Sequence, residues 1–220
     1  MEWNTEKELV SIIHKELFTA VIGDILDDHG CRQQFLPPNL RPLNPSMKLV
    51  GRAMPVLEAD VYDTRSAYGL IFEALDALQP GEIYVAVGAS THYALWGELM
   101  TTAANARGAV GAVIDGSIRD VHGVLSFAHF PVFCTGITGQ DQKGRGRAID
   151  YRVPVEIGGV KIEPGSMIIG DMDGVVVVPK TVEESVFTQA LAKARTEKTI
   201  KQDLQNGMLA TIAFKKYGIM

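Results

Sequence analysis

A mixed α/β fold, built in layers with helices at both chain ends, is the architecture that the sequence predicts. The length of 220 residues, 46% of them hydrophobic, suits a single domain over residues 1–220 with a full-sized core. Helical spacing of apolar residues marks both ends of the chain, whereas short apolar runs between glycines and prolines mark its middle. We therefore expect one domain in which helices pack on a sheet.

The first forty residues are expected to form two helices and then a loop. Thr5 and Glu8 have the spacing of a capping box, and apolar residues follow at helical intervals. A second helix is expected over residues 20–28, because Gly30 then stops it. The run 35–42 is rich in proline, cannot sustain a helix and is expected to be a loop.

Strands and helices alternate in the middle of the chain. A strand, a helix and a strand are expected in succession over residues 83–87, 97–107 and 109–115, with Gly108 ending the helix. This order is typical of a crossover between two parallel strands. The other elements expected here are a strand over residues 49–58 and a helix over residues 68–78.

The C-terminal third is expected to form short strands and then a long helix. Gly158 and Gly159 separate two apolar runs, which indicates a two-residue hairpin. Thr181 is expected to cap the helix, which runs to about residue 204, because Glu184 follows three positions later. The short strands expected here are residues 153–157, 160–162, 167–169 and 175–178.

Composition excludes several classes of function. The net charge of -5 argues against a broad nucleic-acid surface, which needs a basic footprint. The first residues lack the layout of a signal peptide, and no apolar stretch reaches the roughly 18 residues of a membrane helix. Cys31 and Cys134 are too few for a disulfide framework or a four-cysteine zinc site. We expect a soluble cytoplasmic protein that binds neither nucleic acid nor membranes.

The start of the helix expected at Gly97 is a candidate anion site. The backbone N–H groups of Glu98, Leu99 and Met100 have no acceptor within such a helix and lie at the positive end of its dipole. A carboxylate or phosphate binds readily at such a position. The following strand is expected to end at residue 114 or 115, so its loop emerges at the carboxyl edge of the sheet, where open α/β sheets bind ligands.

That loop carries Arg119 next to Asp120. An arginine can hold a carboxylate through two hydrogen bonds. A carboxylate with few protein partners around it suits a largely hydrated Mg²⁺ or Mn²⁺ rather than zinc. An adjacent Arg-Asp pair is usually a surface pair, so the hypothesis depends on its placement beside the helix start. Together these groups could hold a small 2-oxo acid and stabilise its enolate, with the metal acting as a Lewis acid.

The spacing of these residues resembles a known signature. Twenty residues separate Glu98 from the pair Arg119-Asp120. This spacing is similar to the acidic-X20-Arg-Asp pattern of class II pyruvate aldolases, which cleave 4-hydroxy-4-methyl-2-oxoglutarate or 4-carboxy-4-hydroxy-2-oxoadipate. These enzymes belong to the regulator-of-ribonuclease-activity-A-like superfamily, and the resemblance covers most of the chain in the right order. The similar blocks are residues 19–26, 51–53, 96–99, 106–108, 115–120, 130–133 and 170–179.

The resemblance implies a swivelling β/β/α-type sandwich that forms a homotrimer or hexamer with active sites between subunits. It implies that Arg119 binds the oxo acid and steadies its enolate, that Asp120 ligates Mg²⁺ or Mn²⁺ directly, and that Glu98 meets the metal through water. The helix start, Gly97 to Met100, would bind the substrate with its backbone. A glutamate from a neighbouring subunit's C-terminal helix would also lie near the metal's water, and Glu197 is the candidate, ahead of Glu184.

One departure concerns position 98, where the best-studied aldolases resemble this chain but carry aspartate. Glutamate is one methylene longer, which could shift the water on the metal and change substrate size or rate.

Two functions from different classes follow, with a third left open. The first is a metal-dependent lyase that cleaves a 4-hydroxy-2-oxo acid to pyruvate and a second carbonyl compound, with oxaloacetate decarboxylation as a side activity. The second is a non-catalytic regulator that binds and inhibits an endoribonuclease. Some regulator-like members resemble this chain but lack an acidic residue after the arginine, so Asp120 favours catalysis. A lyase or hydrolase acting on a different acid is the third.

Overall fold

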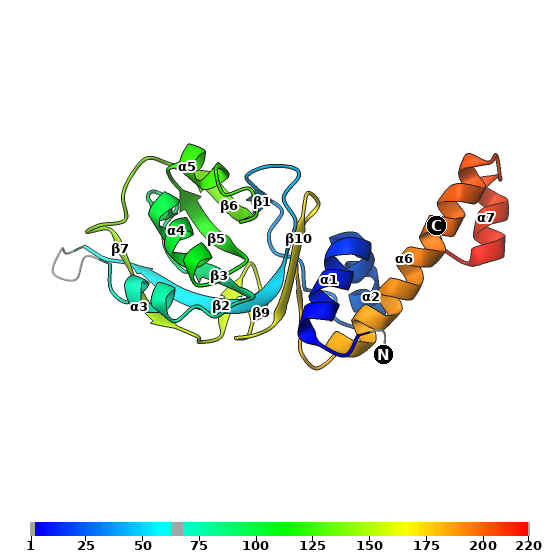
Figure 1. Ribbon diagram of the computed structural model, residues 1–220, viewed down its shortest axis with the longest axis horizontal. Coiled ribbons are helices and arrows are strands. Elements are labelled where there is room, and N and C mark those ends of the chain that lie inside the picture. The colour runs from blue at the N-terminus through cyan, green and yellow to red at the C-terminus, as the bar shows by residue number, and fades with distance from the viewer. Residues whose placement is uncertain (1–2, 63–67, 220) are drawn as a thin grey trace.

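A curved mixed sheet forms the centre of the protein, and helices lie on its two sides (Figure 1). The computed structural model describes residues 3–62 and 68–219. Within them the strand order is β1-β6-β5-β3-β2-β10-β11, with β4 paired to β5 and β7 paired to β2. The strands are β1 (Arg41–Pro42), β2 (Leu49–Asp60), β3 (Glu82–Val87), β4 (Ala94–Trp96), β5 (Gly111–Ile118), β6 (Val132–Ile137), β7 (Gly146–Tyr151), β8 (Val155–Ile157), β9 (Val160–Ile162), β10 (Met167–Asp171) and β11 (Gly174–Val178).

Parallel pairing in the middle of the sheet confirms the expected crossover. Strands β2, β3, β5 and β6 run parallel, and β10 and β11 complete the sheet in antiparallel pairing. The helix between β3 and β5 is α4, which covers the sheet on the side that holds the site described below (Figure 1). The helices are α1 (Glu6–Glu16), α2 (Thr19–Asp28), α3 (Ile71–Asp76), α4 (Glu98–Ala106), α5 (Val121–Leu125), α6 (Glu183–Gln205) and α7 (Ala210–Tyr217).

The apolar side chains form three layers around the sheet, because successive residues of a strand point to opposite faces. In β3, Ile83 and Val85 face an inner layer closed by the β8–β9 hairpin, whereas Tyr84 and Ala86 face α3, α4 and α5. The third layer joins α1, α2 and α6 to β10 and β11. Figure 1 shows the two groups of helices on opposite sides of the sheet.

The two N-terminal helices form as expected. Thr5 and Glu8 make the capping box reciprocally, and the helix buries Leu9 and Ile13. Gly30 follows α2 with a φ of +77°, a conformation that glycine adopts without strain. The run 35–42 contains no helix, as expected, although Arg41–Pro42 pairs with β6 as the short strand β1.

The C-terminal third confirms the hairpin and corrects the helix cap. Gly158 and Gly159, with φ of +57° and +83°, join β8 and β9. Thr181 does not cap α6, because the N–H of Val182 donates to the Pro179 carbonyl and the helix begins only at Glu183. The end of α6 and α7 extend away from the rest of the protein (Figure 1).

Two further boundaries differ from expectation because of pairing between distant segments. The helix expected over 68–78 is restricted to α3, since the backbone of Tyr68 and Leu70 bonds to Ala148 of β7. Strand β5 continues past residue 115 to Ile118, because β4 pairs alongside its last residues. None of the helices in the described part of the chain is long and apolar enough to cross a membrane.

Candidate functional site

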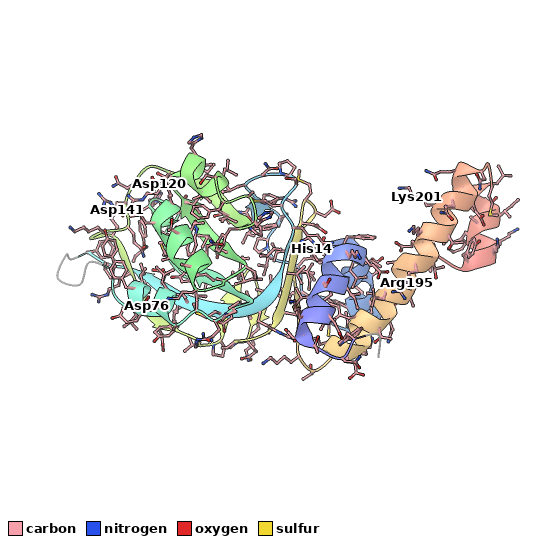
Figure 2. All side chains as sticks on the ribbon, in the orientation of Figure 1. His14, Asp76, Asp120, Asp141, Arg195 and Lys201 are labelled. Carbon is pink, nitrogen blue, oxygen red and sulfur yellow. The ribbon has the colours of Figure 1, made fainter. Side chains whose placement is uncertain are left out.

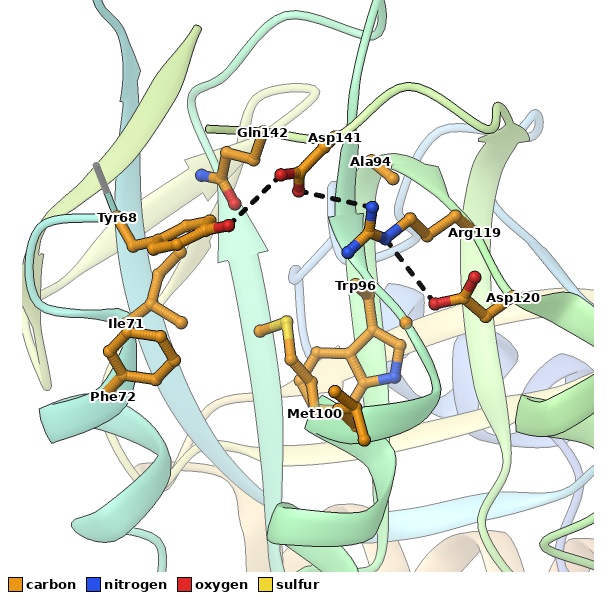
Figure 3. A pocket seen from close by; sticks show the side chains of 12 residues that line it. Tyr68, Ile71, Phe72, Ala94, Trp96, Met100, Arg119, Asp120, Asp141 and Gln142 are labelled. Atoms are coloured by element: carbon orange, nitrogen blue, oxygen red, sulfur yellow. Dashed lines mark hydrogen bonds and ion pairs between the residues drawn. The ribbon is translucent and has the colours of Figure 1, made fainter. Parts of the chain in front are cut away.

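A cavity of about 200 Å³ lies between α3, the start of α4 and the ends of β4 and β5 (Figure 3). One wall is polar and contains the only charged side chains among its described lining residues, Arg119, Asp120 and Asp141. The opposite wall is largely apolar. Its full lining is Tyr68, Ile71, Phe72, Ala94, Trp96, Gly97, Leu99, Met100, Arg119, Asp120, Asp141 and Gln142.

Trp96 anchors the segment that leads into α4. Its indole is 1% exposed, stacks on the Phe130 ring at 6.2 Å between centroids, and donates from Nε1 to the Thr101 hydroxyl at 2.8 Å. The Thr101 hydroxyl in turn donates to the Gly97 carbonyl at 3.0 Å. The start of the helix is therefore held by buried contacts from the strand before it and from its own first turn.

Position 97 brings this helix start against the Arg-Asp pair. A β-carbon built on Gly97 would lie 2.8 Å from Asp120 Oδ2, closer than real β-carbons approach other atoms, and 3.3 Å from Arg119 Cγ, which is tighter than most such contacts. The backbone at 97 is extended, with a φ of -163°, so glycine matters here for the space it leaves to the two side chains and not for its backbone freedom. Gly97, Arg119 and Asp120 therefore lie together, as the sequence predicts.

The first turn of α4 supplies backbone donors to the cavity. The first backbone bond within the helix runs from the N–H of Thr101 to the Gly97 carbonyl at 3.0 Å. Leu99 and Met100 line the cavity, and their N–H groups come before this first donor, so they have no acceptor within the helix. These are the donors that the anion site expected from the sequence would use.

Arg119 and Asp120 are positioned by backbone rather than by tight side-chain bonds. The N–H of Arg119 donates to the Trp96 carbonyl at 2.9 Å, which fixes the end of β5 beside β4. Asp120 adopts a left-handed backbone with a φ of +54°, an uncommon state for a residue other than glycine. It precedes α5 without making a side-chain cap, so its carboxylate is directed to the site and does not serve the helix.

The guanidinium of Arg119 lies between two carboxylates (Figure 3). Its Nε is 3.5 Å from Asp120 Oδ2, and its Nη1 is 3.4 Å from Asp141 Oδ1. Both distances are longer than ordinary hydrogen bonds to a carboxylate, so donors of Arg119 remain for a ligand. The Tyr68 hydroxyl donates to Asp141 Oδ2 at 3.1 Å, and burial followed by the charge of Asp141 raises the pKa of that hydroxyl.

Glu98 lies beside the cavity but does not line it. Its side chain covers Gly123 of α5 so closely that a β-carbon at position 123 would overlap the carboxylate. The Glu98 carboxylate therefore lies against α5 and not in the cavity. Glu98 is therefore next to the cluster of Gly97, Arg119 and Asp120 but does not reach the cavity that they line.

Glu197 lies far from this cavity within one subunit. It belongs to α6 between Arg195 and Lys201, which Figure 2 places at the opposite end of the protein from Asp120. Glu184, at the start of α6, lines a surface hollow with Arg52 and is also outside the cavity. Either glutamate could approach the cavity only from a second subunit.

Three polar residues of the cavity were not predicted from the sequence: Tyr68, Asp141 and Gln142. Asp141 and Gln142 reach it because Ala94 bridges to Asp141 and its N–H donates to the Gln140 carbonyl at 2.8 Å. Tyr68 is held there by the Ala148 N–H, which donates to the Tyr68 carbonyl at 3.1 Å. From the sequence, the segment 136–147 is expected to be a loop that reads the distal half of the substrate, but neither Asp141 nor Gln142 stands out within it.

The donor set limits which metal could bind. No group of three or more histidine, cysteine, aspartate or glutamate side chains able to hold a metal occurs in the described ranges 3–62 and 68–219. A closed zinc site, which needs four such ligands, does not fit. Asp120, a half-exposed carboxylate with its oxygens in the cavity, fits a hard cation that keeps most of its waters.

Comparison with known proteins assigns the family. The family model described as RraA-like, Aldolase/RraA, matches residues 19–177. A protein of Halalkalibacterium halodurans named "Putative 4-hydroxy-4-methyl-2-oxoglutarate aldolase" is 34% identical over 198 residues, which are 89% of this chain and 89% of that protein.

Solved structures share the fold. An uncharacterized protein from Pseudomonas syringae gives a TM-score of 0.85 at 28% identity, over 99% of this chain and 97% of that one. Streptomyces coelicolor RraAS2, described as an unusual member of the RNase ES inhibitor RraA protein family, gives a TM-score of 0.80 at 26% identity, over 91% of this chain and 100% of that one. These neighbours confirm the swivelling β/β/α-type architecture that the resemblance implied. The chain belongs to the RraA-like family of aldolase and RraA proteins.

Proposed function

We propose that this protein is a divalent-metal-dependent lyase that cleaves a 4-hydroxy-2-oxo acid to pyruvate and a second carbonyl compound. One observation carries the proposal: Gly97 brings the first turn of α4 against Arg119 and Asp120 at the edge of one cavity. Anion donors, a guanidinium and a hard carboxylate oxygen then face the same space. The name of the Halalkalibacterium halodurans relative supports an aldolase.

The chain's own groups account for substrate binding. The carboxylate of the 2-oxo acid would accept from the backbone N–H groups of Leu99 and Met100, where the helix dipole favours negative charge. Arg119 would donate to the 2-oxo oxygen, with its guanidinium steadied on both sides by Asp120 and Asp141.

Asp120 would hold Mg²⁺ or Mn²⁺, with Glu98 contributing through water. When bound, the cation supplies Lewis-acid polarisation of the 2-oxo group. The uncommon backbone of Asp120 places its carboxylate beside Arg119, so a cation held by Asp120 would act on the same end of the substrate as the guanidinium.

Bond cleavage places negative charge where Arg119 can stabilise it. The C4 hydroxyl loses its proton to a solvent base, its C–O bond becomes the carbonyl of the second product as the C3–C4 bond breaks, and the electron pair of that bond stays on the pyruvate fragment as an enolate that water protonates at C3. Charge on the enolate oxygen grows during this step, so a donor already in place there stabilises the transition state more than the ground state. Oxaloacetate gives the same enolate when it loses CO₂, so decarboxylation is expected as a second reaction.

The active assembly is proposed to be a homotrimer or hexamer. Leu99 and Phe72, at the edge of the cavity, are 83% and 59% exposed, which leaves apolar surface uncovered in the single subunit. The position of Glu197 on α6, remote from its own cavity, is compatible with a role in a neighbouring site.

A non-catalytic regulator of an endoribonuclease is the second candidate. It is favoured by the fold shared with Streptomyces coelicolor RraAS2, which is described as a member of an RNase ES inhibitor family. Asp120 argues for the lyase, because inhibition by surface contact has no need for a carboxylate beside the arginine.

The test is pyruvate release, coupled to lactate dehydrogenase, from a panel of 4-hydroxy-2-oxo acids and oxaloacetate with Mg²⁺ or with EDTA. The lyase predicts turnover that EDTA abolishes and Mg²⁺ restores. No turnover on any substrate, together with capture and inhibition of an endoribonuclease, would establish the regulator instead. The spontaneous decarboxylation of oxaloacetate is subtracted in each case.

A further inference from the structure

A buried carboxyl group lies directly behind the polar wall of the cavity. Glu58 of β2 is 1% exposed, and its Oε2 accepts from Gln142 Nε2 at 2.6 Å. Its Oε1 has no hydrogen-bond partner among the residues that the structure describes. Burial raises the pKa of Glu58 to about 7, because a carboxylate is costly away from water.

The surroundings of Glu58 are polar but only partly paired. Tyr84 of the adjacent strand β3 is completely buried, and its hydroxyl also lacks a partner within the described ranges. Burial and then the charge of Glu58 raise the pKa of Tyr84 well above its usual value. A buried, half-satisfied group of this kind is energetically costly, so its presence calls for an explanation such as a role at a neighbouring site.

Glu58 determines which end of the Gln142 amide faces the cavity. Because the amide nitrogen donates to Glu58, the amide oxygen is the end that remains, and Figure 3 shows it on the side of Tyr68. The Gln142 backbone is fixed as well, since its carbonyl accepts from the N–H groups of Arg145 and Gly146 at 2.8 and 3.1 Å. Gln142 is 3% exposed and therefore presents a preorganised acceptor.

The neighbours of Gln142 extend this acceptor character. Asp141 is next to it in the chain and lines the same cavity, and the Tyr68 hydroxyl already donates its proton to Asp141. Arg119, on the same wall, lies 3.4 Å from Asp141, and the proposed function assigns its donors to the 2-oxo group. Beyond Arg119, Asp141 and Gln142 therefore offer oxygen lone pairs to a ligand. A hydroxyl group would be bound there, and a second carboxylate would be repelled.

We propose that Gln142, oriented by Glu58, is the specificity-determining residue for the distal half of the substrate, and that it selects adducts of pyruvate with an uncharged hydroxyaldehyde over adducts with a second oxo acid. This inference depends on the proposed lyase function and refines it. In it, Gln142 touches the substrate and Glu58 is a positioning residue that acts through Gln142.

The test uses three substrates that differ only beyond C3: 4,5-dihydroxy-2-oxopentanoate, 4-hydroxy-2-oxopentanoate and 4-hydroxy-4-methyl-2-oxoglutarate. We expect the dihydroxy acid to be preferred in kcat/KM over each of the others by about tenfold, the worth of one good hydrogen bond to a hydroxyl. Gln142→Met should abolish the preference over 4-hydroxy-2-oxopentanoate, mainly through KM. Glu58→Leu should do the same, whereas Glu58→Gln should keep the preference because its amide oxygen can still accept from Gln142.

The control is Gln189→Met, which makes the same change at an exposed position of α6 away from the cavity. An equal or greater kcat/KM for the glutarate in the wild type would overturn the inference, as would a Gln142→Met variant that keeps the preference. Release of pyruvate from any of the three upholds the lyase in either case. If none of the three substrates releases pyruvate, the proposed lyase function is wrong, and calorimetry of dihydroxy-acid binding then tests Gln142. Binding that is about tenfold weaker in Gln142→Met than in the wild type supports the role of Gln142, and equal binding overturns it.

Discussion

Substitution of Gly97 by alanine tests the close approach on which the site depends. The added methyl group would lie 2.8 Å from Asp120 Oδ2 and 3.3 Å from Arg119 Cγ, so one or both side chains must move by several tenths of an ångström. The extended backbone at position 97 is open to alanine, so the change acts through space at the site and introduces no strained dihedral.

The expected loss is large for activity and small for stability. A displacement approaching 1 Å of a group that binds the reacting atoms costs up to about a hundredfold in rate, so kcat/KM for pyruvate release should fall about tenfold to a hundredfold. Replacing a glycine by alanine at a helix N-cap costs roughly 1 kcal/mol or less in the free energy of unfolding. Catalysis and folding should therefore separate clearly.

The assay is pyruvate release with saturating Mg²⁺, run beside a urea unfolding curve. Gly139→Ala serves as the matched control, because a β-carbon there meets no atom within 4 Å. A Gly97→Ala variant with wild-type kcat/KM would refute the reasoning that positions 97, 119 and 120 act on one ligand. A loss equal to that of Gly139→Ala would refute it as well.

Three further outcomes are expected. Asp120→Asn, which tolerates the left-handed backbone, should abolish Mg²⁺-dependent turnover while changing the unfolding free energy by no more than about 1 kcal/mol; turnover that persists would remove the metal role. Arg119→Ala should lower kcat/KM by at least about a hundredfold, and a loss below tenfold would argue against transition-state stabilisation by the guanidinium. Because burial raises the pKa of Glu58 to about 7, its contribution to stability is full below about pH 4.5 and declines as the pH rises through 7. The free energy of unfolding of Glu58→Gln, measured in urea, should therefore rise relative to that of the wild type by up to about 3 kcal/mol as the pH goes from 5 to 8. A difference between the two proteins that stays constant with pH would contradict this.

Local signals predicted the elements that depend on neighbouring residues. The capping box of Thr5 and Glu8, the hairpin at Gly158 and Gly159, and the crossover through α4 all depend on residues within a short stretch of chain. The same local reasoning identified Gly97 as the start of a helix, and the structure confirms it as the N-cap of α4.

Contacts between distant segments were beyond such reasoning. The helix expected over 68–78 lost its first residues to pairing with Ala148, eighty residues after Tyr68 in the chain. Asp141 enters the cavity through a bridge to Ala94, and Gln142 is oriented by Glu58 from β2. Nothing in the residue types near these positions indicates their partners, because the pairing depends on how the sheet closes.

The most direct test of the central claim is a crystal structure of the protein with Mn²⁺ and oxalate, a stable mimic of the pyruvate enolate. The claim is that Asp120, Arg119 and the first turn of α4 hold one ligand together. It predicts an anomalous peak for Mn²⁺ beside the Asp120 carboxylate, with oxalate accepting from Arg119 and from the N–H groups of Leu99 and Met100. Mn²⁺ or oxalate bound only away from these residues would contradict it.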